Sequence, residues 1–196
     1  MELLDEAINF AVAAHSGMYR KKSKTPYILH PMEAAAIAGT MTDDAETIAA
    51  AVLHDTVEDT DVTPEEIRDR FGDRVAFLVG CETENKREGI PRDETWQARK
   101  EETLELLRST DDIGVKILVL SDKLSNMRSF YRKYEECGDA LWQDFHQKDK
   151  NKQYWYYDTI ADLLSDLKDC EAWKEYRCLI DKVFNKEKDQ NGSGNV

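Results

Sequence analysis

The most informative stretch of the chain reads Leu53-His54-Asp55-Thr56-Val57-Glu58-Asp59-Thr60. Glu58 follows His54 by four residues, which places the two side chains on one side of a helix. Asp59 follows Asp55 by the same step. The stretch therefore predicts a helix that gathers one imidazole and three carboxylates on one broad face.

The residues around this polar face are apolar. Residues 49–53 read Ala-Ala-Ala-Val-Leu, and Val57 precedes the second pair of acids. A polar helix face is often simply a solvated surface, and this is the alternative for these residue types. Beside so many apolar neighbours, however, we expect the helix to be largely buried, and buried polar groups need a partner such as a metal ion. The stretch therefore predicts a hydrolytic metal site.

Two further segments supply donors for the same metal. His30 precedes Pro31, which suits the first position of a helix, so we expect His30 where an extended stretch meets a helix. Asp122 follows the apolar residues 117–120, and its alternative role is that of a helix cap or turn residue. The predicted ligands are thus His30, His54, Asp55 and Asp122. Two imidazoles and two carboxylates suit Mn²⁺, Fe²⁺ or Zn²⁺ better than Mg²⁺, which prefers oxygen ligands and water.

Glu58 and Asp59 are predicted to transfer protons rather than to bind the metal. They lie on the same helix face as two of the ligands but outside the ligand set. A bound divalent cation lowers the pKa of a coordinated water and polarises a phosphoryl oxygen. The two carboxyl groups can then activate or orient the water and protonate the leaving oxygen, which is worth about 10²–10⁴-fold in rate. The sequence does not divide these roles between them.

Apolar spacing predicts helices along almost the whole chain and hence an all-α fold. Asp43 and Glu46 resemble a capping box before the helix of the polar face. Thr63 and Pro64 open a short helix that we expect to end at Gly72. Further helices are predicted over residues 4–12, 74–83, 94–108, 115–130, 154–167 and 172–184.

Length and composition indicate one core. The 196 residues are 41% hydrophobic and 34% charged, and we expect a single compact domain over residues 1–184 with a flexible tail over 185–196. No apolar run approaches the roughly 20 residues of a membrane span, and the first residues do not resemble a signal peptide, so we expect a cytoplasmic location. The four cysteines lack Cys-x-x-Cys spacing, which favours reduced thiols.

The net charge of −13 argues against general nucleic-acid binding, because that needs an extended basic surface. A local basic cluster is nevertheless present, since residues 20–24 read Arg-Lys-Lys-Ser-Lys shortly before His30. An anionic ligand responds to the local field, so Arg20 and Lys21 are predicted to bind a polyphosphate. The alternative is a solvated basic loop.

At this point the chain resembles a known family. The motifs His30-Pro31, His54-Asp55 with Glu58-Asp59, and residues 122–128 are similar to the ordered motifs of HD-domain phosphohydrolases, specifically the RelA/SpoT-type alarmone hydrolases. Residues 14–21 and Pro26-Tyr27 resemble the first motif of that family, so the resemblance covers about residues 5 to 130. At 196 residues the chain is shorter than the long bifunctional enzymes and is similar to a stand-alone small alarmone hydrolase.

The resemblance implies a compact helical HD-domain bundle and a specific reaction. Members of this family remove pyrophosphate from the 3′-oxygen of the guanosine alarmones (p)ppGpp and release GDP or GTP, with Mn²⁺ as the expected cofactor. It also implies that Arg20 and Lys21 lie near the substrate phosphates and Asn126 near the nucleoside. Tyr154 is a further candidate for lining the base pocket, although aromatic residues are core residues by default.

The chain departs from the family pattern at two positions near Asp122. Val119 stands where a lysine is common, and Ser125 stands where a histidine is common. Other HD-domain relatives act on nucleoside monophosphates, deoxynucleotides or cyclic nucleotides, and alarmone-hydrolase-like members can remove a phosphate from NADPH. A phosphatase or nucleotidase of this kind is therefore one alternative. A catalytically silent nucleotide-binding module on the same helices is the other.

Overall fold

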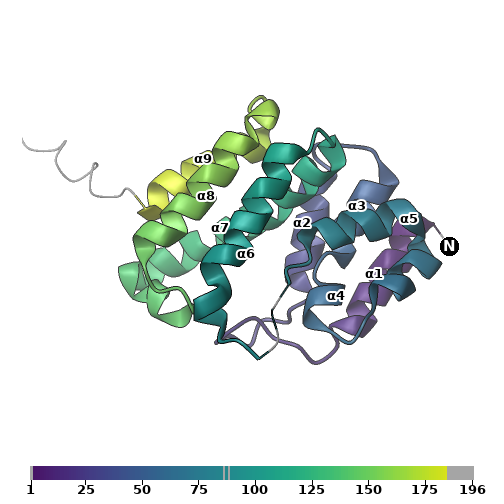
Figure 1. Cartoon of the computed structure of the whole chain (residues 1–196), viewed down its shortest axis with the longest axis horizontal. Coiled ribbons are helices and arrows are strands. Elements are labelled where there is room, and N and C mark those ends of the chain that lie inside the picture. The colour runs from purple at the N-terminus through teal and green to yellow at the C-terminus, as the bar shows by residue number, and fades with distance from the viewer. Residues whose placement is uncertain (1, 86, 88, 185–196) are drawn as a thin grey trace, which may run out of the picture.

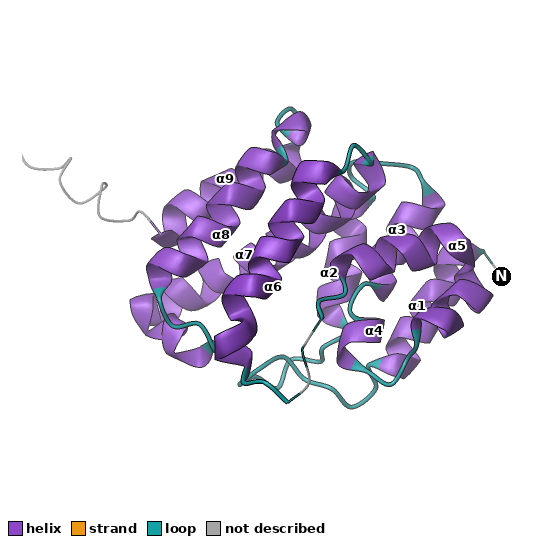
Figure 2. Cartoon of the chain, viewed as in Figure 1, coloured by secondary structure: helices purple, strands orange, loops and turns teal. Residues whose placement is uncertain are grey.

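The computed structural model describes residues 2–85, 87 and 89–184, and throughout these ranges the chain folds into helices joined by loops (Figure 2). The predicted all-α fold is confirmed. In the described ranges, the β-structure consists of an isolated antiparallel bridge between Tyr19 and Pro26. No described helix combines the length and apolarity needed to cross a membrane. The predicted tail over 185–196 lies outside the described residues.

The helices follow one another closely along the chain. They are α1 (Leu3–Ala14), α2 (Leu29–Ala38), α3 (Ala45–Leu53), α4 (Thr56–Asp59), α5 (Pro64–Glu82), α6 (Arg92–Ser109), α7 (Ile113–Cys137), η1 (Gly138–Asp144), α8 (Lys150–Leu163), η2 (Ser165–Leu167) and α9 (Glu171–Phe184).

The long helix α7 joins two groups of helices. Figure 1 shows α1, α3 and α5 together at one end of the molecule, and α8 and α9 at the other. Helix α7 packs against α3 and α5 of the first group and α9 of the second, and also against α2 and η1. Its residues from Gly114 to Ser125 are all buried, and they include Asp122. The mid-helix burial of Asp122 excludes the cap or turn role considered from the sequence.

The polar stretch is not one continuous helix, so that prediction is wrong in one respect. Helix α3 ends at Leu53 and α4 begins at Thr56, with His54 and Asp55 in the turn between them. The His54 ring bonds to Ala51 O at 2.9 Å, and the Thr56 hydroxyl donates to Leu53 O at 2.6 Å. These carbonyl oxygens thus accept hydrogen bonds from side chains, whereas in a continuous helix they would accept from backbone N–H groups.

Most predicted helix ends are close to the observed ones. The cap of α3 is Asp44, not Asp43, because its carboxylate accepts from the N–H groups of residues 46 and 47. Thr63 caps α5 as predicted, and Gly72, at φ +88°, interrupts that helix where an end was expected. Helix α8 begins at Lys150, four residues before the predicted start, because Asp149 caps it.

Candidate functional site

The four predicted metal ligands lie together, although they come from three separate segments. His30 lies in the first turn of α2 with Nε2 3.0 Å from Asp122 Oδ1, and His54 Nε2 lies 3.5 Å from the same oxygen. Asp55 Oδ2 lies 3.1 Å from His54 Nε2 and 3.5 Å from His30 Nε2. The candidate ligand atoms of His30, His54 and Asp122 all lie within 4.8 Å of one another. Two imidazole nitrogens and two carboxylate oxygens therefore surround one small volume.

The orientation of His54 fits a bound cation. Because a carbonyl oxygen only accepts, its contact with Ala51 O assigns a hydrogen to Nδ1 of the ring. The other nitrogen, Nε2, is buried without a hydrogen-bond partner and faces carboxylate oxygens. Burial opposes protonation of this ring, but Asp55 and Asp122 outweigh it and hold the pKa of His54 well above its usual range. Together with the nearby carboxylate oxygens, this nitrogen forms a donor set that suits a divalent cation.

Asp122 is held in the ionised state by its neighbours. Burial opposes ionisation, but Lys123 and the two histidines keep the pKa of Asp122 well below its usual range. Lys123 Nζ lies 2.5 Å from Asp122 Oδ2 and 3.1 Å from Glu82 Oε2. This leaves Asp122 Oδ1 on the side of the histidines.

The two predicted proton-transfer residues lie next to the ligands. Both line a cavity of about 180 Å³ that also reaches His30, Asp55 and Asp122. Burial, followed by the charge of Glu84, raises the pKa of Glu58 to about 7. Its Oε2 accepts a hydrogen bond from the backbone N–H of Glu84 at 3.3 Å.

Tyr27 connects the ligand set to Asp59. Its hydroxyl oxygen lies 2.7 Å from Asp55 Oδ2 and 2.8 Å from Asp59 Oδ2. Burial and the two carboxylates raise the pKa of Tyr27, so it stays a hydrogen-bond donor. From the sequence, Tyr27 was only part of a motif that resembles the family, and its role becomes visible only once the two carboxylates are placed beside it.

Two of the four predicted substrate-binding residues line the cavity. Arg20 Nη2 donates to Asn126 Oδ1 at 3.1 Å, and both residues face the same space as the ligands. Lys21 is exposed, and it is not among the lining residues. Tyr154 is also absent from the lining: its ring packs against Phe184 at a centroid distance of 5.5 Å, as a core aromatic residue does.

Charged residues from α5, the following loop, α6 and α7 complete the lining. Lys100 and Lys123 have largely buried side chains, and both line the cavity. Lys100 pairs with Glu84 at 2.5 Å, and Glu82 pairs with Lys123. The lining comprises six carboxylates and three cations: Asp55, Glu58, Asp59, Glu82, Glu84 and Asp122, with Arg20, Lys100 and Lys123. The site is therefore acidic before any metal binds.

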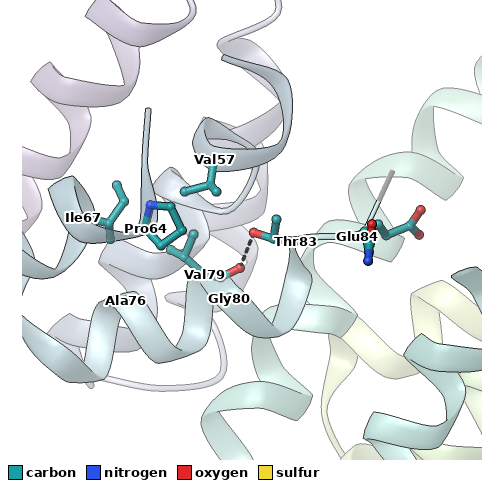
Figure 3. A pocket seen from close by; sticks show the side chains of 9 residues that line it. Val57, Pro64, Ile67, Ala76, Val79, Gly80, Thr83 and Glu84 are labelled. Carbon is teal, nitrogen blue, oxygen red and sulfur yellow. Dashed lines mark hydrogen bonds between the residues drawn. The ribbon is translucent and has the colours of Figure 1, made fainter. Parts of the chain in front are cut away.

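A second, apolar pocket of about 310 Å³ lies beside α4. Figure 3 shows Val57 above Pro64 and Val79, with Glu84 turned away from them. Val57 thus faces this apolar pocket, while the next residue, Glu58, lines the polar cavity. Val57 is partly buried against the core, so α4 has an apolar side and a side that faces the site.

Comparison with known proteins identifies a matching family model and relatives of similar sequence. A family model described as "HD domain" matches residues 7–148. Over 135 residues, the chain is 41% identical to a guanosine-3′,5′-bis(diphosphate) 3′-pyrophosphohydrolase of Aquifex aeolicus, covering 69% of this chain and 19% of that protein. A GTP pyrophosphokinase rsh of Brucella ovis is 39% identical over 127 residues, which are 65% of this chain and 17% of the relative. The chain thus spans about a fifth or less of the length of these curated relatives.

Two solved structures match over most of their length. The protein lmo0812 of Listeria monocytogenes EGD-e has a TM-score of 0.69 and 32% identity, over 79% of this chain and 98% of that one. A metazoan ortholog of SpoT, described as hydrolysing ppGpp, has a TM-score of 0.71 and 24% identity, over 95% and 96% of the two chains. The second likeness is one of fold alone.

Proposed function

This chain belongs to the HD-domain family, and on that basis we propose that it is a metal-dependent hydrolase that removes pyrophosphate from the 3′-position of (p)ppGpp. The observation that carries the proposal is the convergence of two histidines and two aspartates beside a cavity that Glu58 and Asp59 also line. The name of the Aquifex aeolicus relative supports the choice of substrate.

The metal ligands in this proposal are His30, His54, Asp55 and Asp122, and the metal is Mn²⁺. A divalent cation held there would lower the pKa of a coordinated water and polarise a phosphoryl oxygen. The chain itself supplies one anionic oxygen from Asp122, whose ionisation Lys123 maintains. A mixed nitrogen and oxygen donor set favours a transition metal over Mg²⁺.

Glu58 and Asp59 handle protons. With its pKa raised to about 7, Glu58 exchanges a proton near neutral pH, which is the range where an acid or base is most effective. Asp59 shares the Tyr27 hydroxyl with Asp55, so its carboxylate is fixed in orientation. Together these groups can take the proton of the attacking water and return one to the 3′-oxygen of the leaving nucleoside.

Arg20 and Asn126 are proposed to contact the nucleotide. Arg20 reaches the cavity and can pair with a phosphate oxygen once it releases Asn126. The Asn126 amide lines the cavity and donates to Asp122 Oδ1 at 2.7 Å, and in this proposal its second N–H bonds a ribose or base group. Lys21 remains a prediction for a phosphate contact, and a cytoplasmic location remains a prediction from the sequence.

A product assay tests the substrate. The purified chain is incubated with Mn²⁺ and, separately, with ppGpp, pppGpp, NADPH, deoxynucleoside triphosphates and nucleoside monophosphates, and the products are separated by ion-exchange chromatography. We expect pyrophosphate from ppGpp and pppGpp. Release of orthophosphate from NADPH or a monophosphate would contradict the proposal and identify the protein as a phosphatase or nucleotidase. Metal binding without turnover would favour a nucleotide-binding module.

Two variants separate metal binding from proton transfer. His54→Ala removes one ligand, and we expect it to lose both Mn²⁺ and turnover. Glu58→Gln keeps the donor set, and we expect it to retain Mn²⁺ but lose about 10²–10⁴-fold in turnover. The exposed Glu136 near the end of α7 provides a matched control, and Glu136→Gln should turn over normally. Full activity in Glu58→Gln would contradict the assigned role.

A further inference from the structure

The ring of His30 is held by a hydrogen-bond chain on the side away from the other ligands. Its Nδ1 lies 2.8 Å from Ser125 Oγ, and that hydroxyl donates to Glu33 Oε2 at 2.7 Å. A serine hydroxyl has one proton to donate, and an ionised carboxylate only accepts. Since the Ser125 proton is directed to Glu33, Ser125 Oγ accepts from His30. The Nδ1 of His30 therefore carries a hydrogen, and its Nε2 points to Asp122 and the metal position.

Glu33 is kept in place by a second cation. Arg128 Nη1 donates to Glu33 Oε1 at 3.1 Å, while Nε and Nη2 of Arg128 donate to Glu175 at 2.7 and 2.6 Å. The guanidinium therefore lies in a fixed, bidentate pair and presents one further N–H to Glu33. Glu33 thus accepts from Arg128 through Oε1 and from Ser125 through Oε2, and this sets the direction of the hydrogen bond between Ser125 and His30. The chain of contacts connects α2, α7 and α9.

The two histidines of the site are thus oriented by different means. His54 donates to the backbone carbonyl of Ala51, which belongs to the adjacent turn of its own chain segment. His30 depends on a side chain, that of Ser125, which comes from another helix and is fully buried. A substitution at position 125 therefore acts on one histidine and leaves the other unchanged.

We infer that Ser125 and Glu33 are positioning residues that hold His30 with its Nε2 directed at the metal. A metal-bound imidazole needs an acceptor for its second nitrogen, and loss of such an acceptor typically weakens metal binding by about 10–100-fold. Ser125 supplies that acceptor, and Glu33 makes the Ser125 hydroxyl an acceptor by taking its proton. The inference rests on the proposed metal site and is independent of the nucleotide substrate.

Ser125→Ala tests the inference, and Ser121→Ala is its matched control. Both serines are fully buried in α7, and the Ser121 hydroxyl donates to Ile117 O at 2.7 Å within the helix. Titration calorimetry of the metal-free full chain with MnCl₂ gives the dissociation constant. We expect Ser125→Ala to raise it about 10–100-fold and Ser121→Ala to leave it unchanged. Wild-type affinity in Ser125→Ala, or an equal loss in Ser121→Ala, would overturn the inference.

A spectroscopic readout distinguishes positioning from a general loss of stability. In the Zn²⁺-loaded protein, the Nδ1–H proton of His30 should give a downfield, slowly exchanging NMR signal that persists in Ser121→Ala and moves upfield in Ser125→Ala. If Ser125→Ala does not fold, Glu33→Gln decides the question, because it keeps the shape but removes the charge of the acceptor. We expect Glu33→Gln to weaken Mn²⁺ binding, and unchanged binding would refute the inference. A wild-type protein that binds Mn²⁺ without releasing pyrophosphate would refute only the proposed function.

Discussion

At the scale of single residues, Glu58 links the chemistry of the site to the stability of the protein. Burial and nearby acids raise its pKa from 4.5 to about 7. Between these pH values the folded protein keeps a proton that the unfolded chain has released, so the free energy of unfolding falls as the pH rises. A shift of this size corresponds to roughly 3 kcal/mol, lost in full above pH 7.

Glu58→Gln should therefore stabilise the metal-free protein at pH 8 while impairing catalysis. The glutamine has no charge to desolvate, and we expect a gain of about 1–3 kcal/mol at pH 8 but little change at pH 4.5. Urea denaturation at both pH values measures the difference. The exposed control Glu136→Gln should follow the wild-type pH dependence. An equal pH dependence of Glu58→Gln and the wild type would contradict the raised pKa.

The residues of the site could be predicted from the sequence only where they lie close together along the chain. His54 and Asp55 are adjacent and set among apolar residues, so their pairing was visible. Lys123 and Ser125 were not recognised as parts of the site, because their roles depend on groups that other helices bring to them. Lys123 meets Glu82 from α5, and Ser125 meets Glu33 from α2.

At the scale of elements, the junction of α3, α5 and α7 is packed around one glycine. A Cβ at Gly114 would lie 2.5 Å from Arg74 Nη2 and 2.9 Å from Thr47 Oγ1. Arg74 pairs bidentately with Asp112, whose carboxylate caps α7. An added methyl group there therefore disturbs the start of the helix that carries the metal ligand Asp122.

The same substitution at two glycines should change stability in opposite directions. We expect Gly114→Ala to destabilise the fold by about 1–3 kcal/mol through overpacking. Gly80 lies within α5, where an added Cβ meets no atom within 4 Å, so Gly80→Ala should stabilise the fold by about 0.5–1 kcal/mol through helix propensity. Thermal unfolding by circular dichroism measures both. Stabilisation by Gly114→Ala would show that the Arg74 and Thr47 side chains move aside freely.

The spacing of apolar residues predicted that most of the chain is helical, but it did not predict the break between α3 and α4. The break depends on a threonine hydroxyl and an imidazole binding carbonyls of the preceding turn. Both groups can equally point to solvent in a continuous helix, so their spacing alone does not distinguish the two structures. The end at Gly72 was predictable because its positive φ suits glycine in particular.

At the scale of the whole molecule, the metal should stabilise the fold, because its ligands come from segments far apart in the chain. Mn²⁺ that binds only the folded protein adds about 2.7 kcal/mol at a hundredfold excess over its dissociation constant. We expect a higher melting temperature with Mn²⁺ and no shift in His54→Ala. A similar rise in His54→Ala would mean that Mn²⁺ binds elsewhere, for example to the acidic surface.

The class of protein could be predicted from the sequence, but the pocket that selects the substrate could not. Composition and helical spacing indicated one helical core, and three short motifs indicated the metal site. The lining of the cavity also includes charged side chains of α5 and α6, where nothing in the local sequence distinguishes an inward lysine from a surface one. The net charge of −13 likewise gives no hint that acidic groups are concentrated in the cavity.

The metal ligands lie in α2, in the turn after α3, and in α7. They therefore leave the ribosome at different times during synthesis. The two histidines emerge early, but Asp122 and its partner Lys123 follow only when α7 is made. Since chains begin to fold from the N-terminus during synthesis, the first helices can assemble before the donor set is complete. We expect chains arrested before α7 to retain no Mn²⁺ on gel filtration, so that metal loading is a late step in the maturation of the protein.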